Sequence, residues 1–214
     1  MKIYLIRHGR QSSALCNVNV DLAPEGFRQA ALVGERLVPQ KIQVVYSSDL
    51  TRAVQTAQAA NLYWNVEHIV RPELREICFG ELEGLSDREI SEQFADFKRE
   101  QAKMERDIAY PGGECAADVI RRAFPVLEEI AAGDEQSVAV VTHGGVIRSV
   151  AAHILGMDLA RWRALAVSLE NCSITELSVD AAGHFTVERF NDYAHLEAYP
   201  ELLRRHWDGK EIPQ

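Results

Sequence analysis

The sequence lacks the long apolar runs of membrane proteins, and it also lacks the signal peptide and the paired cysteines of disulfide-rich secreted proteins. No apolar run approaches the roughly 20 residues of a membrane-spanning helix, and the opening MKIYLIRHG shows no signal-peptide pattern. The four cysteines lie far apart without a CxxC pair, which indicates neither a zinc knuckle nor a redox dithiol. We therefore expect a cytoplasmic protein with free thiols.

Basic charge is also scarce. The chain has 23 Lys and Arg against 32 Asp and Glu, a formal net charge of −9. Non-specific binding to nucleic acid or to anionic membranes needs a basic face, so neither partner is expected. An anionic substrate must instead be held by a local cluster of arginine and histidine. The composition, 47% hydrophobic and 26% charged, is typical of a globular protein, and we expect a single domain over 1–214.

Short apolar, β-prone runs alternate with helical patterns along the chain. The runs are 2–6, 43–46, 66–70 and 137–141. The helical patterns between and beside them are 24–37, 49–60 and 114–131. This alternation predicts an α/β fold, a three-layer αβα sandwich with a mostly parallel central sheet. Residues 173–179 and 184–190 flank a turn that contains Gly183, which adds one antiparallel edge hairpin.

A long charged stretch interrupts the alternation. Residues 87–106 have a helical pattern, and the segment 108–113, with its Pro and two glycines, breaks it. Such a stretch is commonly a solvated helix face. Its functional interpretation is a helical lid at about 87–110, which would cover a binding pocket.

Histidine follows two of the predicted strands. Arg7-His8-Gly9 comes after the first, and Thr142-His143-Gly144-Gly145 comes after the run at 137–141. Ligands of open α/β sheets bind beyond the carboxyl ends of the strands. Glycine lets the backbone approach a ligand, and a helix beginning near Gly145 would direct N–H groups at an anion. With the donor forks of Arg7 and Arg52, this set suits a phosphoryl group.

Phosphoryl transfer also needs a nucleophile and a proton for the leaving group. A neutral imidazole can be the nucleophile, and a carboxylic acid in LREICFGELEG, either Glu76 or Glu83, can supply the proton. A metal site is not expected, because no HxH, HxxxH or carboxylate-rich cluster supplies three ligands in one place. No cofactor is expected either.

Over nearly its whole length the sequence resembles the histidine phosphatase, or phosphoglycerate-mutase-like, superfamily, and within it the phosphatase branch. The resemblance is carried by an ordered set of motifs: LIRHG at 5–9, LAPEGFRQA at 22–30, SSDLTRAVQTA at 47–57, LREICFGELEG at 74–84, PGGE at 111–114, VVTHGG at 140–145 and FNDYAHL at 190–196. One RHG would be weak, whereas the ordered set is specific.

The resemblance implies a phosphohistidine at His8, with Glu76 as general acid and then general base. It also implies the groups that hold the phosphoryl oxygens: Arg7, Arg52, His143 and the Gly144 N–H. Glu83 would then have a structural role.

The early loop departs from the family pattern. Most members carry an asparagine soon after RHG that touches the phosphate, and here Ala14 takes its place. We expect Asn17 or Asn19 to substitute for it from a reshaped loop.

These expectations combine into metal-independent hydrolysis of a small phosphomonoester by a monomer or a homodimer. The first alternative is a cofactor-dependent phosphoglycerate mutase. Mutases resembling this chain typically carry a longer insertion between the acid and PGGE, and here that stretch is short. The second alternative is a catalytically silent protein that binds a phosphorylated ligand. The pattern of residues does not name the physiological substrate.

Overall fold

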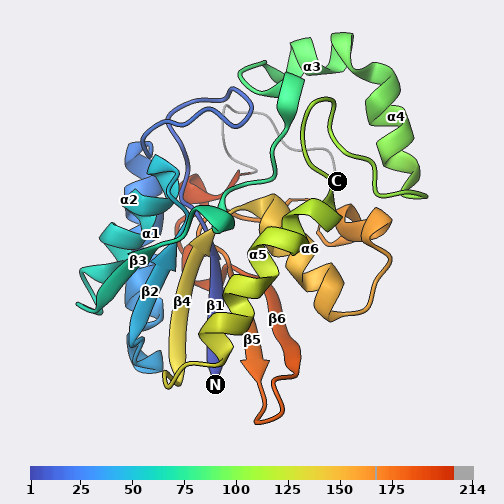
Figure 1. Cartoon of the computed structure of the whole chain (residues 1–214). Helices are drawn as coiled ribbons and strands as arrows, with labels where there is room; N and C mark the ends of the chain where they lie inside the picture. The colour runs from blue at the N-terminus through green and yellow to red at the C-terminus, as the bar shows by residue number, and fades with distance from the viewer. Residues whose placement is uncertain (167, 205–214) are drawn as a thin grey trace.

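The computed structural model describes residues 1–166 and 168–204, and a six-stranded sheet forms its centre (Figure 1). The strand order is β3-β2-β4-β1-β5-β6. The strands are Lys2–Arg7 (β1), Val44–Ser47 (β2), Glu67–Val70 (β3), Ser137–Thr142 (β4), Ile174–Val179 (β5) and Phe185–Asp192 (β6). The first four in that order are parallel, whereas β5 runs antiparallel to β1 and to β6. The predicted mostly parallel sheet with an antiparallel edge hairpin is confirmed.

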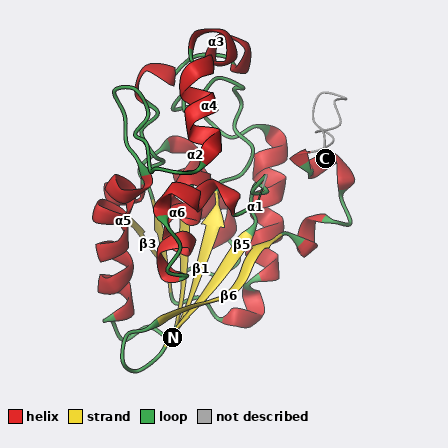
Figure 2. Ribbon diagram, turned by 90° about the vertical axis from the view of Figure 1, so that its right-hand side faces the viewer, coloured by secondary structure: helices red, strands yellow, loops and turns green. Residues whose placement is uncertain are grey.

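Helices cover both faces of the sheet, which confirms the three-layer prediction (Figures 1 and 2). They are Pro24–Arg36 (α1) and Thr51–Asn61 (α2) on one face, and Ala116–Ala131 (α5) and Gly144–Ile154 (α6) on the other. In β1, Tyr4 and Ile6 pack with α1 and α2, whereas Ile3 and Leu5 pack with α5 and α6. Side chains alternate along a strand, so an all-apolar strand serves both cores.

The charged stretch forms two helices rather than the single one expected over 87–106. Ser86 begins Asp87–Gln93 (α3) with a reciprocal capping box, and Ala95–Lys103 (α4) ends at Met104, whose φ is 52°. The break at Phe94 lets Phe94 and Phe97 both pack against the α5–α6 core. Both views place α3 and α4 beyond the carboxyl ends of the parallel strands (Figures 1 and 2).

Helix α5 begins at Ala116, two residues later than predicted. Glu114 stays in the preceding loop because its N–H donates to the Cys78 carbonyl at 2.9 Å, and the Asp107 carboxylate accepts the first helical N–H groups. Six short 3₁₀ turns complete the described chain: Val38–Gln40, Pro72–Leu74, Gly80–Leu82, Leu159–Ala164, Ala194–Leu196 and Pro200–Leu202. None of the helices within residues 1–166 and 168–204 is long and apolar enough to cross a membrane.

Candidate active site

The two histidines meet because their strands are neighbours. β1 and β4 pair in parallel register up to Arg7 and Thr142, and His8 and His143 are the next residues on each. The His8 N–H donates to the Thr142 carbonyl at 2.9 Å, and the two imidazole ring centroids lie 5.0 Å apart. The prediction that the HG motifs face one another across the sheet edge is confirmed by this geometry.

His8 is a neutral imidazole whose Nε2 is unprotonated and keeps its lone pair. Its side chain is 4% exposed, and Nδ1 lies 2.7 Å from the Gly9 carbonyl oxygen, which only accepts, so Nδ1 carries the proton. Arg52 Nε donates to His8 Nε2 at 3.3 Å, which fits the same tautomer. Burial, with the positive charges of Arg52 and Arg7, holds the pKa of His8 well below its usual range.

Arg52 lies inside the site, 2% exposed, at the start of α2. Its two terminal nitrogens donate to the Val18 carbonyl at 3.0 Å and to Asn17 Oδ1 at 2.6 Å. Asn17 adopts a φ of 47° and also donates to Glu83 at 2.8 Å. Asn19 instead accepts the Thr51 N–H at 2.8 Å, at the start of α2. Of the two asparagines, Asn17 is therefore the one beside the arginine fork.

Arg7 brings a second guanidinium to the same place. One of its terminal nitrogens donates to the Leu169 carbonyl, and its Nε is buried without a hydrogen-bond partner among the described residues. A Cβ built on Gly144 would lie 3.6 Å from that Nε, so the donor faces the beginning of α6. Burial and the charge of Arg204 lower the pKa of Arg7 to about 9, which leaves it a cation at neutral pH.

His143 is fully buried at the beginning of α6. Its Nε2 shares a hydrogen bond of 2.7 Å with the Ser48 hydroxyl, and Nδ1 has no partner among the described residues. Burial and the neighbouring His8, Arg52 and Arg7 hold its pKa well below the usual range. His143 is therefore a second neutral imidazole, and Ser48, which the sequence reasoning missed, fixes one of its nitrogens.

Glu76 reaches the site from the loop that follows β3. Its carboxylate accepts the Gly145 N–H and the Ile77 N–H, each at 2.9 Å, which places it at the positive end of α6. A Cβ on Gly145 would lie 2.5 Å from Glu76 Oε1 and 2.6 Å from Ile77, so only glycine admits this approach. Glu83 instead accepts hydrogen bonds from the Phe79 N–H at 3.0 Å and from the Asn17 amide at 2.8 Å.

A half-buried ion pair supports the Glu76 loop on the side of α5. The Arg122 guanidinium on α5 donates to the main-chain carbonyls of Glu73, Arg75 and Glu76 and to the Glu114 carboxylate. Glu114 in turn accepts the Cys78 N–H at 2.9 Å. This explains the glutamate of PGGE. The sequence reasoning missed Arg122, since nothing in its helical surroundings distinguishes it.

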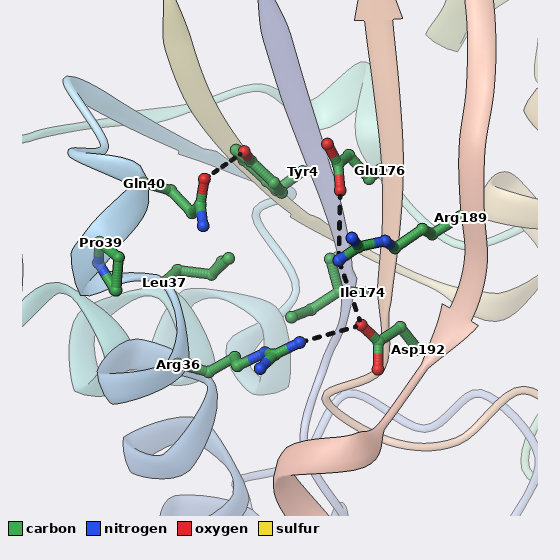
Figure 3. A pocket seen from close by; sticks show the side chains of 9 residues that line it. All are labelled: Tyr4, Arg36, Leu37, Pro39, Gln40, Ile174, Glu176, Arg189 and Asp192. Carbon is green, nitrogen blue, oxygen red and sulfur yellow. Dashed lines mark hydrogen bonds and ion pairs between the residues drawn. The ribbon is translucent and has the colours of Figure 1, made fainter.

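A groove of about 530 Å³ opens beside the Glu76 carboxylate. It is lined by Asn17, Val18, Asn19, Leu50, Arg75, Glu76, Cys78, Glu83 and Gly84. A separate hollow of about 290 Å³ lies between the end of α1 and strands β5 and β6 (Figure 3). There Arg36 pairs with Asp192 at 3.4 Å and Arg189 with Glu176 at 3.8 Å, so its charges satisfy one another. In the part of the chain that the structure describes, no cluster of three or more His, Cys, Asp or Glu side chains is placed to hold a metal.

Comparison with known protein families places the chain that carries this pair of histidines and arginines. Residues 3–193 match the model of the histidine phosphatase superfamily, branch 1. The chain belongs to this superfamily.

Two plant proteins and a mycobacterial structure illustrate the range of this superfamily. Phosphoglycerate mutase-like protein 4 of Arabidopsis thaliana is 33% identical, over 92% of this chain and 87% of its own. The metal-independent phosphoserine phosphatase of Arabidopsis thaliana is 31% identical, over 99% of this chain and 90% of its own. The structure of mycobacterial glucosyl-3-phosphoglycerate phosphatase superposes with a TM-score of 0.80 at 26% identity, covering 89% and 98%. Phosphatases and mutase-like proteins thus both occur among this histidine phosphatase's relatives.

Proposed function

We propose that the protein is a metal-independent phosphatase that cleaves small phosphomonoesters through a phosphohistidine on His8. The observation that carries the proposal is the tautomer of His8, since its Nε2 lone pair faces the buried arginine fork and is not protonated. The names of its relatives, a phosphoserine phosphatase and a glucosyl-3-phosphoglycerate phosphatase, support phosphomonoester chemistry.

The reaction would proceed in two in-line displacements. In the first, His8 Nε2 attacks phosphorus, the P–O bond to the alcohol breaks, and Glu76 gives its proton to the departing oxygen. In the second, Glu76 takes a proton from water, the hydroxide oxygen attacks phosphorus, and the P–N bond breaks to regenerate neutral His8. Phosphate is released and Glu76 is protonated again.

The cations would stabilise the charge that spreads over the phosphoryl oxygens. A phosphoryl group at His8 Nε2 takes over the donor of Arg52, while the unpartnered Nε of Arg7 turns to another oxygen. We assign supporting contacts to three further groups: His143, the Gly144 N–H and the Asn17 amide. Because Arg52 and His143 are buried, they act locally despite the net charge of −9.

We also propose that the chain is a single domain and that α3 and α4 form a helical lid over the pocket that contains His8 and Glu76. Gln101 of α4 accepts a hydrogen bond from Arg163, which ties the lid to the segment after α6. For the location, we propose the cytoplasm, because Cys16, Cys78, Cys115 and Cys172 are free thiols, the usual state in reducing compartments.

The test is phosphate release from a panel of phosphomonoesters, with and without EDTA, beside a mutase assay on 3-phosphoglycerate. Release that persists in EDTA and is absent from His8→Ala is the expected result. Loss of activity in EDTA would overturn metal independence. Isomerisation without release would favour the mutase suggested by the mutase-like relative, and silence in both assays would favour a phosphate-ligand binding protein.

A further inference from the structure

The His8–Gly9 and Gly9–Arg10 peptide groups, which follow β1, are held by side chains rather than by the sheet. In the His8–Gly9 peptide, the carbonyl oxygen accepts the Asn171 amide at 2.7 Å and the N–H donates to the Thr56 hydroxyl at 2.9 Å. In the Gly9–Arg10 peptide, the N–H donates to Gln29 Oε1 at 2.8 Å. The carbonyl oxygen of this second peptide is the group that accepts the proton of His8 Nδ1.

The three side chains come from three separate parts of the chain. Gln29 belongs to α1, Thr56 to α2, and Asn171 to the loop before β5, and they are 0%, 0% and 2% exposed. A buried polar side chain that satisfies loop peptides fixes their orientation, because breaking the bond would leave a buried group unsatisfied.

Each side chain is itself anchored. Thr56 donates to the Arg52 carbonyl at 2.6 Å, and Gln29 donates to the Leu202 carbonyl at 2.7 Å. Arg204 donates to Asn171 Oδ1 at 3.2 Å. The loop also has no room to move toward α1, since a Cβ on Gly9 would lie 2.6 Å from the Gly26 carbonyl oxygen.

We propose that Gln29, Thr56 and Asn171 are positioning residues for the nucleophile. They fix the two peptides after β1, and through the Gly9 carbonyl they set both the tautomer and the ring direction of His8. The proposal rests on the phosphohistidine mechanism above for its kinetic consequences. The tautomer itself is independent of turnover.

The first readout is the ¹⁵N spectrum of the histidine rings, with the His8 signals assigned by their absence from His8→Ala. Wild type should show His8 protonated at Nδ1. In Gln29→Met, which removes the acceptor of the Arg10 N–H, the Gly9 carbonyl is released and the two His8 tautomers should mix. A wild-type His8 spectrum in folded Gln29→Met would overturn the proposal.

The second readout is the burst rate of phosphoenzyme formation. A displacement of about 1 Å at a reacting group costs on the order of 100-fold in rate, so Thr56→Val and Asn171→Asp should slow the burst by about 10- to 100-fold. The substrate dissociation constant, taken from the concentration dependence of the burst rate, should change little, because neither side chain is expected to touch substrate. Thr56→Ser keeps the hydroxyl and should restore most of the rate.

Asn61→Asp is the matched control, because the Asn61 amide donates to a main-chain carbonyl, that of Val66 at 2.8 Å. Asn61 is the last residue of α2, whereas Arg52, which contacts His8, lies at the start of that helix. It should lower thermal stability and leave the burst rate unchanged. Equal slowing in Asn61→Asp, or a burst as slow in Thr56→Ser as in Thr56→Val, would contradict the positioning role and leave these side chains a general effect on stability. A wild-type enzyme with the predicted His8 tautomer but no phosphate release from any phosphomonoester would contradict the proposed function and leave the positioning role standing.

Discussion

At the scale of single residues, the two site histidines are placed by the ends of strands β1 and β4. His8 and His143 were predictable because two apolar runs each lead directly into an HG pair, and parallel strands end at one edge of a sheet. The choice between Asn17 and Asn19 was not predictable. It depends on a positive φ at Asn17 and on the use of Asn19 at the start of α2, which only the folded loop shows.

Replacing Glu76 with Gln tests the assignment of the proton donor. The variant should lose about 10²- to 10⁴-fold in kcat on alkyl phosphomonoesters. It should lose much less on p-nitrophenyl phosphate, because that leaving group needs little protonation. The matched replacement Glu83→Gln should show no such dependence on the leaving group. Equal slowing of both substrate classes by Glu76→Gln would reject Glu76 as the acid.

At the scale of elements, the sheet and its flanking helices were predictable because their patterns are long and strongly periodic. The division of 87–106 into two helices was not predictable. It depends on the packing of Phe94 and Phe97 against the core, and helix propensity carries no information on tertiary packing. The support of the Glu76 loop by α5 was hidden for a similar reason. Its contacts run from Arg122 to main-chain carbonyls, which leave no trace in the sequence.

Replacing Arg122 with Lys tests that support. Lysine cannot reproduce the fork, so carbonyls of the Glu76 loop lose donors, at a cost of about 1–3 kcal/mol in stability. The kcat on alkyl esters should fall on the order of 10-fold or more as Glu76 is displaced. Arg121→Lys is the control, because Arg121 is the exposed neighbour and pairs only with Asp118 among the contacts described. Equal kcat values for the two variants would contradict the supporting role.

At the scale of the whole molecule, buried neutral histidines make stability depend on pH. Burial lowers the pKa of His8, His143 and His68, and that of His195 to about 4. The unfolded chain binds these protons near pH 6.5 and the folded chain does not. Stability is therefore complete above about pH 6.5 and is lost as pH falls below it.

Urea unfolding at several pH values between 7.5 and 5 measures this loss. Each fully buried histidine, such as His143, adds up to about 1.4 kcal/mol per pH unit to the slope. His68→Gln, which changes a histidine outside the site, should give a shallower slope than wild type. A free energy of unfolding that does not fall below pH 6.5 would contradict the neutral, buried state of the two site histidines.

The central claim is that the phosphoryl group of the substrate is transferred to His8. The most direct measurement is to quench the enzyme during turnover of a labelled phosphomonoester and to map the label by mass spectrometry. The denaturant is kept at neutral or alkaline pH, because acid would hydrolyse phosphohistidine. We predict an acid-labile phosphoryl group on the peptide that contains His8, and none in His8→Ala. Label on another residue, or phosphate release by wild type with no labelled His8 at any quench time, would contradict the account.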